Sequence, residues 1–263
     1  MSKFEQATAV VKTGENSWRG ELLPGWRIGQ VPNGGYVLAI AGRALAEALP
    51  HSDPLSVHII YTAPTVLGPV DCTVDVLRVG GSTSHAALSM HQQGDLKAYV
   101  TACYSDLGRL QGESWSSVER PVITPVSEVP ATGGHGIELR ESVDQHYASG
   151  GEVFRRGDPD GSGCFNGWLK LRDGSDPDLL SLLLFADCMA PPVFTVYGAL
   201  HWVPTLELSV QLRAAPAPGP VQTRFRSRYM TDGIVEEDGE IWDSTGKLVA
   251  LSRQTSKVRV QKS

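Results

Sequence analysis

The sequence lacks the cysteine and histidine patterns that mark metal sites and disulfide frameworks. Its 263 residues include four cysteines, Cys72, Cys103, Cys164 and Cys188, each isolated in the chain. Zinc sites and disulfide frameworks usually place cysteines in closely spaced pairs. The seven histidines also lack metal-ligand spacing, so we expect reduced thiols and no metal.

Basic charge and long apolar runs are scarce as well. The chain has 29 acidic and 23 basic side chains, which gives a formal net charge of -6. It therefore has no overall positive field to attract nucleic acid or an anionic membrane surface. No apolar run reaches the roughly 18 residues that cross a bilayer, and the first residues lack the basic and apolar segments of a secretory signal. We expect no nucleic-acid partner, no stable membrane insertion and a cytoplasmic location.

The sequence contains neither a G-x-S-x-G motif nor a glycine-rich phosphate-binding loop. These absences argue against a serine-hydrolase triad and a nucleotide cofactor. Hydrophobic residues make up 41% of the chain and charged residues 20%, as in globular proteins with a sizeable core. We therefore expect a folded protein without a bound cofactor.

An internal repeat is the main positive feature. The segment YTAPTVLGPV resembles RAAPAPGPV, and QGDLKAYVTAC resembles TGKLVALSRQT. Aligning Pro64 with Pro216 and Leu96 with Leu248 gives an offset of 152 residues in both cases. The equal offset at two separate anchors favours an internal duplication.

Each copy is predicted to contain one buried helix followed by antiparallel strands. Residues 35–49 and 178–190 are apolar on nearly all sides, which is typical of a helix inside a core. Pro191 and Pro192 mark the end of the second helix. Strands are predicted at 55–62, 70–79, 84–92 and 97–105 in the first copy, and at 205–213, 221–231, 235–242 and 248–260 in the second.

A buried helix and a long antiparallel sheet, occurring twice, predict an α+β double hot-dog architecture. Each sheet must wrap around its helix to bury it. We predict an N-terminal unit at 1–110, a connecting segment at 111–140 and a C-terminal unit at 141–263, with the sheets joined edge to edge. The aliphatic sides of the two helices should border a tunnel near the junction.

Four short motifs carry a resemblance to a known family. They are VPNGGYVLA at 31–39, FAD at 185–187, PTLELSVQLR at 204–213 and LVALSRQTSKVR at 248–259. In this order and spacing they resemble the acyl-CoA thioesterase II-like double hot-dog family. The resemblance covers most of both halves. It implies an acyl-CoA substrate, hydrolysis of the thioester and, by analogy, the capacity to form homo-oligomers.

The same resemblance implies a hydrolytic trio of Asp187, Thr205 and Gln254. Relatives often have Asp-His two residues beyond the threonine, where this chain has Glu207 and Leu208. Asp187 is predicted in the last turn of its helix, where burial and the helix dipole would raise the pKa of its carboxyl and suit it as a base near neutral pH. The alternative is a helix-end carboxylate that turns to solvent.

Gln254 shares a predicted strand face with Ser252 and Ser256. Such a neutral polar face beneath a helix can hold a water molecule, although the amide could instead satisfy an edge strand. The residue 152 positions earlier is Ala102. The first half therefore lacks this partner, and we expect one active site per chain.

Thr205 begins a strand whose alternation places it on one face with Glu207, Ser209 and Gln211. Ser209 is therefore a competing source of the hydroxyl. A threonine at the start of a strand is also commonly structural.

Two further groups are candidate substrate-binding residues. Asn33, Gly34 and Gly35 precede or open the first helix, where backbone N–H groups can stabilise an oxyanion or the asparagine can simply cap the helix. Alternating arginines offer a place for the phosphates of coenzyme A or form a solvated strand face. These arginines are Arg224, Arg226 and Arg228.

The sequence therefore predicts hydrolysis of a fatty acyl-CoA to free fatty acid and CoA. Asp187 would accept a proton from a water that Gln254 and Thr205 help to place. One alternative is a hot-dog hydratase or dehydratase, which usually needs an Asp and His pair, and no histidine aligns near Asp187 or Gln254. The other is a non-catalytic acyl-CoA binding module.

Overall fold

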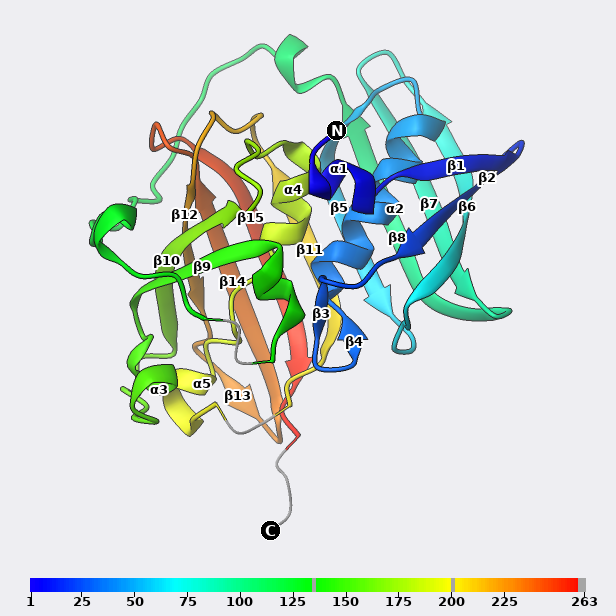
Figure 1. The fold of residues 1–263 in the computed structure, drawn as a ribbon. Helices are drawn as coiled ribbons and strands as arrows, with labels where there is room; N and C mark the ends of the chain where they lie inside the picture. Colours follow the sequence, from blue (N-terminus) through cyan, green and yellow to red (C-terminus); the bar gives the residue numbers. More distant parts are fainter. Residues whose placement is uncertain (134–135, 200–201, 260–263) are drawn as a thin grey trace.

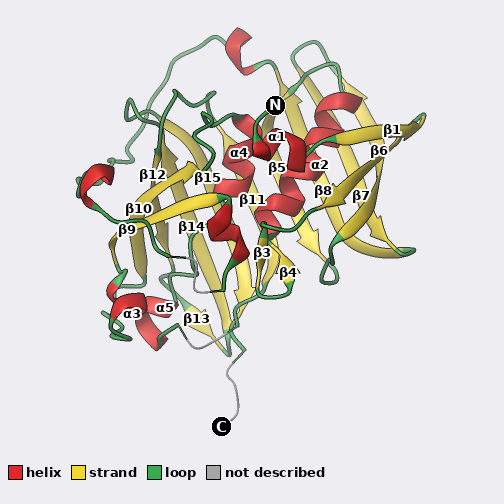
Figure 2. Ribbon diagram, in the orientation of Figure 1, coloured by secondary structure: helices red, strands yellow, loops and turns green. Residues whose placement is uncertain are grey.

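Two apolar helices lie against the same side of one curved antiparallel sheet (Figure 1). The computed structural model describes residues 1–133, 136–199 and 202–259. The ends of the sheet bend around the helices, so that each helix is enclosed by its own half of the strands (Figure 2). This is the double hot-dog architecture predicted from the repeat.

The first unit runs from the N-terminus to the end of its fourth long strand. Its elements are α1 (Lys3–Ala7), β1 (Val10–Gly14), β2 (Ser17–Leu22), β3 (Arg27–Ile28), β4 (Val31–Pro32), α2 (Gly34–Ala48), β5 (Asp53–Tyr61), β6 (Gly68–Val79), β7 (Thr83–Gln92) and β8 (Asp95–Ser105). Short 3-10 turns follow at Leu107–Arg109, Val126–Glu128 and Glu138–Glu141. The predicted connecting segment, 111–140, falls among these turns.

The second unit repeats the plan with a longer connection after its helix. Its elements are β9 (Val143–Ser149), α3 (Glu152–Arg155), β10 (Cys164–Leu171), α4 (Leu179–Phe185), α5 (Phe194–Tyr197), β11 (Thr205–Leu212), β12 (Val221–Arg226), β13 (Met230–Thr231), β14 (Ile234–Trp242) and β15 (Leu248–Lys257).

The order of the strands is symmetric about the centre of the sheet. Among the described residues the order is β1-β2-β6-β7-β8-β5-β11-β15-β14-β12-β10-β9, with β13 paired to β14. The antiparallel pair β5 and β11 joins the two units, and these strands begin at Asp53 and Thr205, 152 residues apart. The offset found in the sequence is therefore the spacing between the two central strands.

The two helices pack directly against each other in antiparallel directions. A Cβ atom on Gly35, at the start of α2, would lie 2.6 Å from the carbonyl oxygen of Leu184, near the end of α4. A Cβ on Gly42 would lie 2.8 Å from Leu183 Cδ1. Glycine is needed at position 35 because a side chain there would collide with backbone atoms and push the helices apart, whereas at position 42 the ends of flexible leucine side chains would have to move. An acyl tunnel cannot run between the helices at these two points.

The second helix is shorter than the predicted 178–190. It ends at Phe185, and the N–H of Asp187 then bonds to the Leu184 carbonyl over a three-residue spacing at 3.1 Å. Side chains from other elements take the next carbonyls: Asn33 Nδ2 donates to the Asp187 oxygen and Gln145 Nε2 to that of Cys188. In a longer helix these two carbonyls would face Pro191 and Pro192, which have no N–H, so the side chains supply donors that the helix itself could not.

Two predicted strands also differ from the structure. The strand predicted at 221–231 is divided into β12 and β13, because Ser227 leaves the sheet and its N–H bonds to the carbonyl of Gly163. The strand predicted at 248–260 ends at Lys257 in the sheet, and residue 260 lies outside the described residues. None of the helices in the described part of the chain combines the length and apolar composition needed to cross a membrane.

Candidate active site

Asp187 lies where the end of the second helix meets the start of the first. It follows α4 by two residues, and its Oδ2 accepts hydrogen bonds from the Gly35 N–H at 3.0 Å and from Asn33 Nδ2 at 2.9 Å. Asn33 caps α2, because its Oδ1 accepts from the N–H of Tyr36 at 3.0 Å. One side chain thus fixes both the start of α2 and the position of the carboxylate.

The pKa of Asp187 is raised to about 6, chiefly by burial. Hydrogen bonds from Gly35, Gly34, Asn33 and Thr205 act in the opposite direction but only partly offset the loss of solvent. The predicted position in the last turn of the helix is wrong, because Asp187 lies two residues beyond α4 and accepts a hydrogen bond from the start of α2. Above about pH 6 this carboxyl is ionised and can accept a proton.

Thr205 and Gln254 meet on neighbouring strands. The Thr205 hydroxyl donates to Gln254 Oε1 at 2.9 Å, and the glutamine is 5% exposed. The hydroxyl also lowers the pKa of Asp187 by hydrogen bonding to its carboxylate. Since a hydroxyl has one proton, it can donate to only one of these acceptors at a time. The structure therefore brings Asp187, Thr205 and Gln254 together.

The predicted face of Thr205 is wrong because a β-bulge interrupts the start of β11. Thr205 pairs with Ser256, whereas Glu207 pairs with the very next residue, Thr255. Leu206 is the extra residue of the bulge, which reverses the alternation of side chains before it. Thr205 consequently points to the inner face of the sheet.

Ser209, the competing hydroxyl, stays on the outer face. Its Oγ lies 2.8 Å from Nδ1 of His58. Nε2 of His58 lies 3.7 Å from Glu207 Oε2 on the same face. Ser209 is therefore separated from Gln254 by the sheet, and only Thr205 is brought to Asp187.

Glu237 is a buried carboxyl that the sequence prediction missed. It lies on β14 opposite Gln254 and is 6% exposed. Burial raises its pKa well above the usual range, the charge of Asp187 raises it further, and a hydrogen bond from Gln254 lowers it. Burial and the charge of Asp187 thus both favour the protonated form of Glu237. Strand alternation was a usable signal, because Glu237 shares the inner face with Val235, while its acidic neighbours face outward.

Tyr61, at the end of β5, was also missed. Its hydroxyl is buried and has no hydrogen-bond partner within residues 1–133, 136–199 and 202–259. A Cβ placed on Gly34 would lie 2.8 Å from this hydroxyl and 2.9 Å from Asp187 Oδ2. Tyr61 thus borders the same small space as the carboxylate.

The three candidate arginines are paired with carboxylates on the outer face of the second unit. Arg224 and Arg226 both contact Glu240, and Arg228 contacts Glu236 at 3.3 Å. Arg228 also lies beyond the end of β12. These ion pairs favour the interpretation as a strand face, and contact with coenzyme A phosphates stays a prediction.

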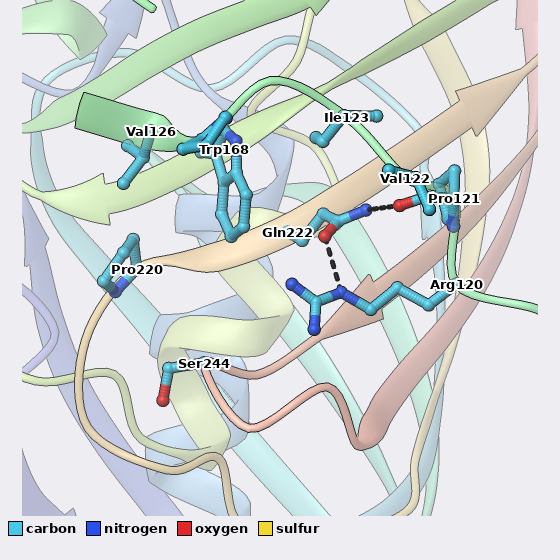
Figure 3. A pocket seen from close by; sticks show the side chains of 10 residues that line it. Arg120, Pro121, Val122, Ile123, Val126, Trp168, Pro220, Gln222 and Ser244 are labelled. Atoms are coloured by element: carbon cyan, nitrogen blue, oxygen red, sulfur yellow. Dashed lines mark hydrogen bonds between the residues drawn. The ribbon is translucent and has the colours of Figure 1, made fainter. Parts of the chain in front are cut away.

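A separate pocket lies beneath the connecting segment (Figure 3). It has a volume of about 540 Å³. Arg120 donates to Gln222 Oε1 at 2.6 Å, Gln222 Nε2 donates to the Pro121 carbonyl, and Trp168 Nε1 donates to the Thr124 carbonyl. These hydrogen bonds attach the connecting segment to the second sheet. None of the residues that line the pocket belongs to the group around Asp187, so the pocket is not the candidate active site.

Comparison with protein families decides the identity of the fold. Residues 22–105 match the acyl-CoA thioesterase N-terminal domain and residues 123–258 match the acyl-CoA thioesterase C-terminal domain. The chain belongs to the acyl-CoA thioesterase family. Asn33, Gly34 and Gly35 fall in the N-terminal match, whereas Asp187, Thr205 and Gln254 fall in the C-terminal match.

A curated relative and two solved structures resemble the chain over nearly its full length. An uncharacterised protein of Mycobacterium tuberculosis is 26% identical, over 93% of this chain and 91% of that protein. A provisionally named thioesterase II from Thermobifida fusca superposes with a TM-score of 0.90 and 29% identity, covering 99% of this chain and 98% of the other. TesB2, an acyl-CoA thioesterase II of Mycobacterium marinum, shares the fold with a TM-score of 0.78 at 17% identity, covering 98% and 99%.

Residues of the types that bind metal ions are not clustered in the described part of the chain. Histidine, cysteine, aspartate and glutamate form no group of three or more placed to hold an ion there.

Proposed function

We propose that this member of the acyl-CoA thioesterase family hydrolyses a fatty acyl-CoA to a free fatty acid and CoA. The observation that carries the proposal is the position of Asp187, whose carboxyl has a pKa raised to about 6 and lies beside the hydrogen-bonded pair of Thr205 and Gln254. A base with such a pKa is ionised at neutral pH and is still strong enough to accept a proton from water.

In the proposed reaction, water attacks the carbonyl carbon of the thioester while Asp187 accepts one of its protons. The new carbon–oxygen bond places negative charge on the former carbonyl oxygen. When the carbonyl reforms, the carbon–sulfur bond breaks and the thiolate of CoA leaves. Thiols of this kind have a pKa of about 8.5, so departure needs little help from an acid, and the thiolate then takes up the proton held by Asp187.

Of the two roles predicted for the start of α2, capping by Asn33 is present, and contact with an oxyanion stays a prediction. The Gly35 N–H and the Asn33 side chain donate to Asp187 itself, and Gly34 also lowers the pKa of that carboxyl. These donors stabilise the ionised carboxylate of Asp187 and hold it in one orientation. The oxyanion then needs a donor elsewhere.

The two alternative functions are less well supported. Among the described residues, no histidine is hydrogen-bonded to Asp187 or Gln254, whereas hydratases of this fold usually use an Asp and His pair. A binding module needs no base, and a buried ionisable carboxyl without a role is costly.

Release of free thiol from a panel of acyl-CoA chain lengths tests the proposal, and binding without release at every chain length would contradict it.

The rate of hydrolysis should depend on pH through Asp187. Because the protonated carboxyl cannot act as a base, kcat/KM should rise as the pH increases through about 6 and then level off. Steady-state rates of thiol release from about pH 5 to about pH 8 give the profile. A profile that is flat across this range would show that another group accepts the proton.

Replacement of Thr205 with valine should lower kcat by about tenfold, because the hydroxyl helps to hold Gln254 and the attacking water. Ser209→Ala is the matched control, since this hydroxyl lies on the outer face beside His58. We expect Ser209→Ala to retain the parent activity. Equal losses of kcat in the two variants would contradict a specific role of the Thr205 hydroxyl in catalysis.

A further inference from the structure

Tyr61 lies at the junction of the two units. It is the last residue of β5, and its neighbour Ile60 forms the final pair with β11, opposite Glu207. Just beyond that pair, β11 begins with its bulge and Thr205. The tyrosine therefore comes from the first unit, whereas the proposed catalytic residues come from the second.

The hydroxyl of Tyr61 is a buried hydrogen-bond donor without an acceptor in the described structure. Buried hydroxyls are normally hydrogen-bonded, and exceptions are found disproportionately where a ligand or a reacting group supplies the partner. Two other buried tyrosines of the same unit illustrate the normal case. Tyr104 donates to the Gly42 carbonyl at 2.9 Å and Tyr36 donates to the Ala7 carbonyl at 2.9 Å.

The unpaired hydroxyl lies close to the carboxyl group of Asp187. A Cβ atom on Gly34 would lie 2.8 Å from the Tyr61 hydroxyl and 2.9 Å from Asp187 Oδ2, too close to both for a side chain to fit. The hydroxyl and the carboxylate oxygen are therefore less than about 6 Å apart on either side of this point. A substrate atom that accepts a hydrogen bond from Tyr61 would lie near the base.

Burial and the charge of Asp187 both keep the phenol of Tyr61 protonated. Burial raises the pKa of the phenol well above its usual range, and the neighbouring Asp187 raises it further. The phenol is therefore protonated throughout the range in which Asp187 is an ionised base. The N–H of Gly35, which could otherwise serve an oxyanion, is already bonded to Asp187.

We propose that the hydroxyl of Tyr61 donates a hydrogen bond to the carbonyl oxygen of the acyl-CoA thioester and stabilises the oxyanion that forms when water attacks. This inference rests on the proposed thioesterase function. During the attack, the electron pair of the C=O double bond moves to oxygen and Tyr61 keeps its proton. When the double bond reforms and the carbon–sulfur bond breaks, the hydrogen bond weakens again.

The experiment compares Tyr61→Phe with Tyr104→Phe in the full chain. Loss of an oxyanion donor should lower kcat by about 100-fold with little change in KM, because the hydrogen bond strengthens only in the transition state. The melting temperature should be equal or higher, since the hydroxyl of Tyr61 has no protein partner to lose. Tyr104→Phe should do the reverse: it loses the bond to Gly42 and some stability, but retains kcat.

The pH profile separates a direct role from an indirect one. If Tyr61 contacts the thioester, Tyr61→Phe should keep the midpoint of the parent profile. A shifted midpoint would instead show that Tyr61 acts by holding Asp187, and it would overturn the proposal, as would parent-like kcat in Tyr61→Phe. If the parent protein released no thiol from any acyl-CoA tested, the proposed function would fail together with this inference, whereas an active parent with an equally active Tyr61→Phe would overturn only the inference.

Discussion

Replacement of Asp187 with asparagine should lower thiol release from acyl-CoA by about 100-fold to 10,000-fold, the usual range for the loss of a general base. Asparagine has nearly the same shape, and its Oδ1 can still accept from Asn33 and Gly35. It cannot take a proton from water. Steady-state kinetics with the best acyl-CoA of the panel measure the loss.

The melting temperature of Asp187→Asn distinguishes a catalytic effect from a folding defect. Burial raises the pKa of Asp187 in the folded state to about 6, from an ordinary value of 3.8. Ionisation of this carboxyl therefore works against folding once the pH exceeds its unfolded pKa. At neutral pH the neutral variant should therefore melt at the same temperature as the parent or higher. Full turnover in a stable variant would refute the role of Asp187 as the base.

Gly35→Ala should produce the largest structural effect. Its Cβ would lie 2.6 Å and 2.9 Å from the carbonyl oxygens of Leu184 and Leu183 and 3.0 Å from Asp187 Cβ. These backbone atoms cannot turn away as a flexible side chain would, so α2 and α4 must separate. We expect a loss of about 1 to 3 kcal/mol in the free energy of unfolding, the usual cost of overpacking, together with loss of most activity.

Gly81→Ala is the matched control for that substitution. Gly81 lies in the turn between β6 and β7, and nothing lies within 4 Å of the Cβ that alanine would add. Urea unfolding of both variants and assay of both under the same conditions measure the contrast. Equal stability of the two variants would show that α2 and α4 can separate without cost.

The repeat and most of the sheet could be predicted from sequence because their signals are local. Apolar and polar residues alternate along strands such as β7 and β8, and glycine turns separate them. The end of α4 could not be predicted in this way. The apolar pattern continues past Phe185, but the chain turns after this residue, and Asn33 and Gln145 donate to the carbonyls of Asp187 and Cys188.

The candidate site shows the same division between local and tertiary information. The family resemblance pointed to Asp187, Thr205 and Gln254, which the structure places together. The face of Thr205 depended on a bulge that appears only when β11 is paired with β15. Tyr61 carries no motif of its own, because its importance comes from the strand of the other unit that lies beside it.

The wide separation of the site residues along the chain affects when the site can form during synthesis on the ribosome. Asn33 and Gly35 are made early, but their hydrogen-bond partner Asp187 follows some 150 residues later, and Gln254 lies on the last strand of the sheet. Contacts between such distant segments form late in folding. The proposed site is therefore still incomplete when the N-terminal unit leaves the ribosome, and it is completed only when β15 joins the sheet.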